Sequence, residues 1–127
     1  MIDMNALTIE QKILQTKVAR IEKGKKLTDK PGAAFFFGEI ITEPDDAGLD
    51  ELRNYVEEVY EEADIPPLIT SDFENGCGSM VKGLTQLPYL MGLGAANDPK
   101  LAYDYGKVTA LEARSIGANW SFSPVAD

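Results

Sequence analysis

The stretch Pro67-Leu68-Ile69-Thr70-Ser71-Asp72-Phe73-Glu74-Asn75-Gly76 decides how this chain is interpreted. It starts as a short apolar strand, runs into Ser71-Asp72, and then reaches a second acid and a glycine. In parallel α/β proteins the functional side chains stand where strands end, because the loops there project into one shared mouth. The stretch therefore predicts a buried strand over 67–71 with a functional carboxylate directly after it.

The segments on both sides alternate between helical and extended patterns. The expected helices cover 8–22, 50–63 and the span from the cap Asp98 to the stop Gly117, and the expected strands cover 32–41, 67–71 and 119–125. Strands that alternate with helices predict an α/β fold with parallel strands and right-handed crossovers. Three βα units do not close a barrel, so open sheet edges are expected at Phe35–Phe37 and Trp120–Val125. Such edges pair with other chains, and a homo-oligomer is one expected consequence.

Composition narrows the function classes. The chain has 127 residues and a net charge of −9, which argues against nucleic acids and anionic membrane surfaces as partners. The sequence has no apolar run long enough to span a membrane, and no signal peptide is predicted. The single cysteine excludes an internal disulfide. These features together predict a cytoplasmic location. The absence of histidine excludes His-based triads and His-ligated metals within this chain, and no cofactor is expected.

Three acids are candidates for substrate binding. Asp72 follows the strand at 67–71 and either accepts hydrogen bonds from ligand hydroxyls or braces its loop as a cap. Glu74 lies two residues on, where a structural role is favoured over a place in the same mouth. Asp127 ends the next strand signal, so neighbouring strands are expected to bring it near Asp72. Two carboxylates at one mouth suit acid–base or sugar chemistry.

Two glycine-rich segments have plainer interpretations. The run Asn75–Ser79 brings backbone close to a ligand or forms an ordinary turn, and Cys77 within it has no histidine to activate it as a nucleophile. Gly92–Asn97 has part of a dinucleotide-loop pattern without the last glycine or a strand before it. The whole of 75–97 is therefore expected to be loop.

Taken together, the segments resemble the N-terminal barrel domain of glycoside hydrolase family 3. The matching pieces, in the family's order, are Leu7–Ile13 (L-T-x-E-x-K-I), 32–41 (its first barrel strand), 67–76 (P-L-[hydrophobic]-x-x-D-x-E-x-G), 83–88 (G-[FL]-T-x-[FL]-P), 97–102, 112–119 (E-x-R-x-x-G-[IV]-N) and 122–127 (F-[AS]-P-V-x-D). The resemblance spans nearly the whole chain. It implies that residues 1–127 are the N-terminal part of a TIM-type (β/α)8 catalytic barrel.

The resemblance also implies a retaining β-glycosidase, with a preference for β-N-acetylhexosaminidase over β-glucosidase. Asp72 matches the family position that binds hydroxyls of the sugar at the cleaved bond, and Glu74 and Asp127 match recurrent acids nearby. The family's nucleophile and acid/base group lie on later strands without a counterpart here, so this chain alone is expected to be inactive. The alternatives are a non-catalytic half-barrel that self-associates or needs a complementary partner, and an inactive fragment.

Overall fold

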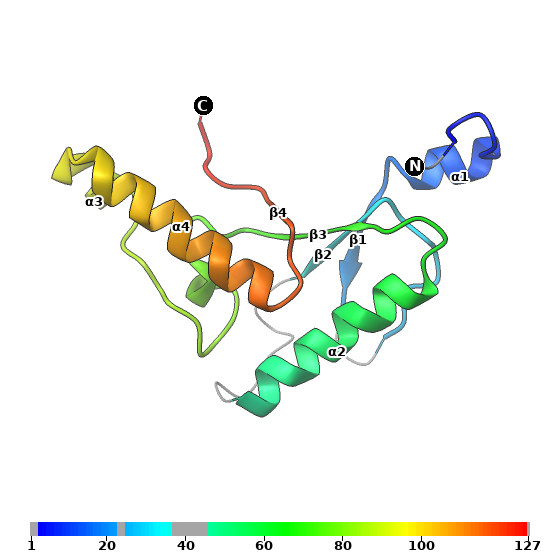
Figure 1. The fold of residues 1–127 in the computed structure, drawn as a ribbon, viewed down its shortest axis with the longest axis horizontal. Helices are drawn as coiled ribbons and strands as arrows, with labels where there is room; N and C mark the ends of the chain where they lie inside the picture. The colour runs from blue at the N-terminus through cyan, green and yellow to red at the C-terminus, as the bar shows by residue number, and fades with distance from the viewer. Residues whose placement is uncertain (1–2, 23–24, 37–45, 127) are drawn as a thin grey trace.

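The structure, a computed structural model, describes residues 3–22, 25–36 and 46–126. Within these residues the chain forms one sheet of four strands in the order β1-β2-β3-β4, so neighbours in the sheet are also neighbours along the chain (Figure 1). The strands are β1 (Val18–Ile21), β2 (Ala33–Phe36), β3 (Leu68–Ser71) and β4 (Trp120–Ser121). All three pairings are parallel, which confirms the α/β class with parallel strands.

The helices connect these strands. They are α1 (Ile9–Leu14), α2 (Asp46–Glu62), α3 (Leu90–Ala96) and α4 (Pro99–Ser115), together with the short 3-10 helix η2 (Cys77–Ser79). α2 links β2 to β3 and α4 links β3 to β4, as crossovers between parallel strands require. Local signals set the starts of α1 and α4: Thr8 and Gln11 form a capping box, and the Asp98 side chain caps α4.

The predicted helix over 8–22 is wrong beyond Leu14. Residues Val18–Ile21 form β1 and pair with β2 in the register Val18↔Ala33 to Ile21↔Phe36. The β-branched Val18 and Ile21 suit a strand, and backbone pairing with β2 outweighs the weak propensity of a short isolated helix. β2 is therefore an interior strand, and the predicted open edge is wrong for Phe35 and Phe36, whereas Phe37 lies outside the described residues. The segment that resembles the family's first barrel strand is the second strand of this sheet.

Other boundaries also differ from the prediction. α2 begins at Asp46 rather than at residue 50, and the region expected to be loop over 75–97 contains η2 and α3. Residues 90–96 are helical and no strand leads directly into them, which agrees with the sequence evidence against a dinucleotide loop. The last strand ends at Ser121, earlier than predicted, and Pro124 further along has no N–H to donate to a neighbouring strand. The part of the predicted strand 32–41 beyond Phe36 lies outside the described residues.

The hydrophobic core lies between the sheet and the layer formed by α2 and α4 (Figure 1). Alternate strand residues face this layer, and the cluster contains Ile21, Ala34, Phe36, Ile69, Leu52, Val56, Ala113 and Ile116. Since successive strand side chains point to opposite faces, the intervening residues face the other way. We call this second side, which carries Phe35, Thr70 and Trp120 in one paired row, the inner face.

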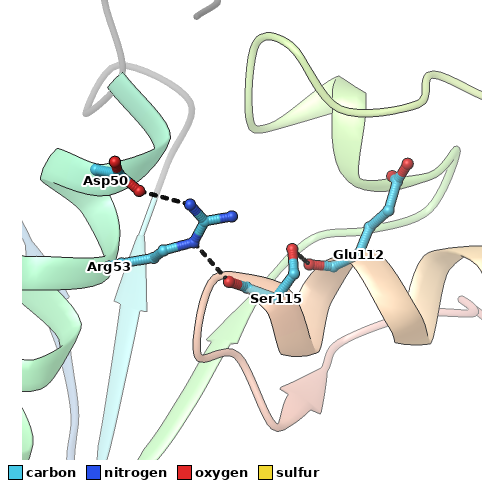
Figure 2. A network of polar contacts seen from close by, with 4 residues as sticks. All are labelled: Asp50, Arg53, Glu112 and Ser115. Atoms are coloured by element: carbon cyan, nitrogen blue, oxygen red, sulfur yellow. Dashed lines mark hydrogen bonds and ion pairs between the residues drawn. The ribbon is translucent and has the colours of Figure 1, made fainter. Parts of the chain in front are cut away.

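Arg53 ties α2 to the end of α4 (Figure 2). Its Nε donates to the Ser115 carbonyl at 2.8 Å, while its Nη1 lies 2.6 Å from Asp50 Oδ1. A guanidinium at the C-terminus of a helix satisfies an unpaired carbonyl and complements the helix dipole. The Ser115 hydroxyl in turn donates to the Glu112 carbonyl at 2.7 Å. The contacts fix the point from which the chain enters β4.

Candidate functional site

Asp72 stands at the carboxyl end of β3, as predicted. Ile69 and Phe73 are odd-numbered positions that point into the core, with exposed fractions of 0% and 1%. Because successive side chains point to opposite faces, Asp72 lies on the inner face. The residue is half-buried, and among the described residues no hydrogen bond or ion pair occupies its carboxylate. The described residues therefore show no cap or brace contact made by this carboxylate.

The strand end before Asp72 is held from both sides. The buried Ser71 hydroxyl donates to the Phe36 carbonyl of β2 at 2.6 Å, and the Phe122 N–H donates to the Ser71 carbonyl at 3.3 Å. At the other end of β3, the Asn119 amide oxygen accepts from the Ile69 N–H at 2.9 Å. Bonds to both neighbouring strands therefore set the position of the Asp72 backbone.

The loop after Asp72 packs tightly against residues 84–87. The Gly78 N–H donates to the Thr85 carbonyl at 2.9 Å, and the Leu87 N–H donates to the Asn75 carbonyl at 2.8 Å. Gly76 has a φ of 81°, and a Cβ there would lie 2.5 Å from the Thr85 carbonyl oxygen. The glycine-rich run thus brings backbone close to other backbone of the same chain, the turn interpretation of this segment.

Two side chains of α4 hold this loop from outside. The Glu112 carboxylate accepts from the Thr85 N–H at 3.0 Å and from the Thr85 hydroxyl at 2.5 Å. The Tyr105 hydroxyl lies 2.8 Å from the Glu74 carbonyl and 2.9 Å from the Pro88 carbonyl, both of which are acceptors for its proton. Seven residues apart, Tyr105 and Glu112 share one face of α4.

Glu74 occupies a different environment from Asp72. Its side chain is exposed and lines a cleft of about 460 Å³ between α3, α4 and the chain around β4, which Asp72 does not line. Most of the cleft's lining residues, including Leu90, Leu93 and Ala110, are apolar. The structure therefore does not bring the two acids into one mouth through their described contacts. Asp127, the third predicted acid, lies outside the described residues.

Cys77 has the surroundings of a structural residue. It is fully buried, and its thiol donates to the Thr109 carbonyl at 3.3 Å. Burial and the nearby charge of Glu112 raise the pKa of the Cys77 thiol to about 12. A thiol that stays protonated at neutral pH is a poor nucleophile.

Sequence reasoning missed two features of this region. Aromatic rings gather on the inner face near the ends of the strands: Phe35 stacks on Phe122 with centroids 5.3 Å apart, and Trp120 meets Phe122 edge-on at 4.8 Å. The other feature is the role of Glu112, for which a signal existed. In the sequence Glu112 falls at helical spacing on one stripe with Leu101, Tyr105 and Val108, and a carboxylate on such a stripe is expected to have a specific partner.

Two kinds of feature are absent from the described residues. No group of three or more His, Cys, Asp or Glu side chains in this part of the chain is arranged to hold a metal ion. In the same residues, no helix is both long enough and apolar enough to cross a lipid bilayer.

Known sequences that are similar to this chain include a protein family and a curated relative. The model of the family described as "Glycosyl hydrolase family 3 N terminal domain" matches residues 8–127. A "Beta-N-acetylglucosaminidase/beta-glucosidase" from Cellulomonas fimi is 34% identical over 65 residues, which are 51% of this chain and 12% of that protein. This match therefore spans only a small part of the relative's length.

Solved structures show the same fold. "Beta-glucoside phosphorylase BglX" has a TM-score of 0.70 and 24% identity over 94% of this chain and 21% of its own. The same protein "bound to 2FGlc" has a TM-score of 0.69 and 23% identity, again over 94% of this chain and 22% of that one. The similarity confirms the predicted fold, the N-terminal portion of a (β/α)8 barrel, with four strands in place of the three expected.

Proposed function

Because the chain belongs to glycosyl hydrolase family 3, we propose that it supplies the first strands of a barrel that hydrolyses O-glycosidic bonds, with Asp72 holding the substrate. The observation that carries the proposal is the Asp72 carboxylate itself. It follows a β3 end that is bonded to both neighbouring strands, and none of the described residues occupies it. Substrates of barrel enzymes bind at this end of the strands.

A carboxylate suits this task because it accepts several hydrogen bonds and donates none. Sugar hydroxyls are donors, and a bond to an ionised acceptor is roughly twice as strong as a neutral one. As the sugar ring distorts towards an oxocarbenium ion, the bonds from its hydroxyls to Asp72 strengthen, and only interactions that strengthen in the transition state raise the rate. In this proposal the chain binds substrate, and the nucleophile of the retaining mechanism lies elsewhere.

The finer assignments are part of the same proposal. We assign Glu74, whose exposed side chain lines the neighbouring cleft, to contacts with parts of the substrate beyond the sugar that Asp72 holds, and Asp127 to a supporting role after β4. A preference for β-N-acetylhexosamine over β-glucose rests on the compact loop before Leu84 alone. The Cellulomonas fimi relative carries both sugars in its name, so the experiment below compares both. The cytoplasmic location stays a prediction.

The test is sugar binding by the full-length gene product, measured by calorimetric titration with N-acetylglucosamine and with glucose. Asp72→Asn removes the charge and keeps the shape, and it should weaken binding of the preferred sugar by about tenfold or more, the value of a hydrogen bond to a charged group. The matched control is Asp29→Asn, which changes an exposed acid before the amino end of β2, whereas Asp72 follows the carboxyl end of β3. This variant should bind the sugars as the wild type does. Equal affinities in all three proteins would refute the role of Asp72.

A second candidate, a half-barrel that associates with another chain, is favoured by one observation. β1 and β4 are the outer strands of the described sheet, and Val18 and Trp120 on them are 47% and 41% exposed. Open edges with apolar side chains pair readily with further strands. Sedimentation of the 127-residue chain at rising concentration tests this candidate: a stable oligomer supports it, and a strictly monomeric, cooperatively melting chain contradicts it.

A further inference from the structure

We propose that Glu112 is a positioning residue for the sugar site: through Thr85 it holds the loop that follows Asp72, and so determines where the Asp72 carboxylate points. This inference rests on the proposed function of Asp72. It starts from the two hydrogen bonds of Glu112, one to the Thr85 N–H and one to the Thr85 hydroxyl. They join residues 27 positions apart, so they connect α4 to a loop whose other described hydrogen bonds lie within residues 75–87.

Both Glu112 oxygens are used in this contact. One accepts from the Thr85 N–H at 3.0 Å and the other from the Thr85 hydroxyl at 2.5 Å. A single residue, Thr85, therefore donates to both oxygens of the carboxylate. Bonds to an ionised acceptor are short and strong, and two of them fix direction as well as distance. In Figure 2 the Glu112 side chain points away from Arg53, which ties the end of the same helix to α2. The carboxylate is thus presented by a helix that is itself anchored.

From Thr85 the constraint passes to the loop after Asp72 through backbone alone. The Thr85 carbonyl accepts from the Gly78 N–H at 2.9 Å, and the Leu87 N–H donates to the Asn75 carbonyl at 2.8 Å. A Cβ at Gly78 would lie 2.4 Å from the Leu84 carbonyl oxygen, so the two segments are already in contact. Backbone in contact with backbone has little room to shift, and a displacement of Thr85 moves Asn75 and Gly78 with it.

A short stretch of backbone connects Asn75 to Asp72. Only Phe73 and Glu74 lie between them, and Phe73 is 1% exposed, with its ring 6.0 Å from that of Phe36. The Tyr105 hydroxyl bonds at the Glu74 carbonyl from the same face of α4 that carries Glu112. On its other side Asp72 follows the anchored β3. Its carboxylate therefore stands between two fixed points, and Glu112 maintains the second of them.

The test uses the full-length gene product and two measurements on each variant. Hydrogen exchange by mass spectrometry reports on peptides that cover 73–80 and 84–88, with a peptide from the middle of α4 as reference, and calorimetry measures the affinity for N-acetylglucosamine and glucose. Glu112→Ala should speed exchange in both loop peptides about tenfold and weaken binding by a similar factor, because the charge-assisted bonds are lost. Exchange in the α4 peptide should not change.

Two further variants separate positioning from general stability. Glu112→Gln retains an oxygen for the Thr85 N–H and offers an amide donor to the Thr85 hydroxyl, so it should restore both readings to near wild type. Thr85→Val keeps the backbone N–H but removes the hydroxyl, and should give an intermediate effect even if Glu112→Ala does not fold. Glu61→Ala, an exposed acid on α2, is the matched control and should leave both readings unchanged.

Each outcome decides a different claim. Unchanged loop exchange in Glu112→Ala and Thr85→Val overturns the proposal, because the loop then does not depend on this contact. Faster loop exchange with wild-type sugar affinity also overturns it, because the loop then does not position Asp72. A wild-type protein that binds neither sugar refutes the proposed function of the site. The exchange measurement still tests the loop in that case: slowed or unchanged exchange of the loop peptides in Glu112→Ala and Thr85→Val overturns the claim that Glu112 holds the loop.

Discussion

Replacing Gly117 by alanine is the most direct test of how α4 leads into β4. Gly117 follows α4 with a φ of 82°, a region that residues with a side chain rarely adopt. A Cβ at this position would also lie 2.6 Å from the Val56 Cγ1 of α2, where ordinary contacts begin at 3.4 Å. Alanine therefore meets a backbone penalty and a steric overlap at once.

The expected destabilisation is the sum of these two effects. The left-handed conformation costs an L-residue about 1–2 kcal/mol, and an overpacked contact in a core costs about 1–3 kcal/mol. The reduced entropy of the unfolded chain returns about 0.4–1 kcal/mol. We expect Gly117→Ala to lower the free energy of unfolding by about 3 kcal/mol.

The assay is urea unfolding followed by the fluorescence of Trp120, the only tryptophan of the 127 residues. The control is Gly106→Ala within α4, where a Cβ meets nothing within 4 Å and helix propensity predicts a gain of about 0.5–1 kcal/mol. Adding Val56→Ala to Gly117→Ala should relieve the overlap, so the double variant should be less unstable than the sum of the singles by about 1 kcal/mol. A Gly117→Ala protein as stable as the wild type would refute the reasoning.

Two further predictions concern stability. Burial raises the pKa of the Cys77 thiol from an ordinary 9.0 to about 12 in the folded chain. The unfolded chain therefore loses this proton at a lower pH, and the free energy of unfolding should fall as pH rises above about 9. Urea midpoints measured at increasing alkaline pH should show this fall, and Cys77→Ala should make it shallower; equal slopes would contradict it. Arg53→Met should cost about 1–2 kcal/mol by freeing the Ser115 carbonyl, whereas Asp50→Asn, an exposed ion pair, should cost under about 0.5 kcal/mol in the same assay.

The parts of the fold with strong local signals were predictable from the sequence. α4 carries its own start and stop, Asp98 before a proline and Gly117 after the last turn, and the apolar run before Ser71 forms β3. Asp72 was found for the same reason, since its place at the end of a strand is a local property. Cap chemistry and apolar runs act within a few residues, and one sequence displays them.

The parts that depend on distant partners were not predictable in this way. β1 was taken for the end of a helix because four residues acquire a strand conformation only by pairing with β2. α3 was missed because its two glycines lower helix propensity, so no local signal indicated a helix there. In both segments the local preference is weak, and tertiary contacts decide the conformation.

By itself the sequence determined that the chain is α/β, that β3 ends in an acid, and which family its segments resemble. Only the tertiary structure decided that Phe35, Thr70 and Trp120 form one row on the face that also carries Asp72. It also decided that Glu74 faces a separate cleft and that Glu112 holds Thr85. The physical reason is that caps and apolar periods act over one turn or strand. Register, shared faces and hydrogen bonds between residues far apart along the chain exist only once the chain has folded.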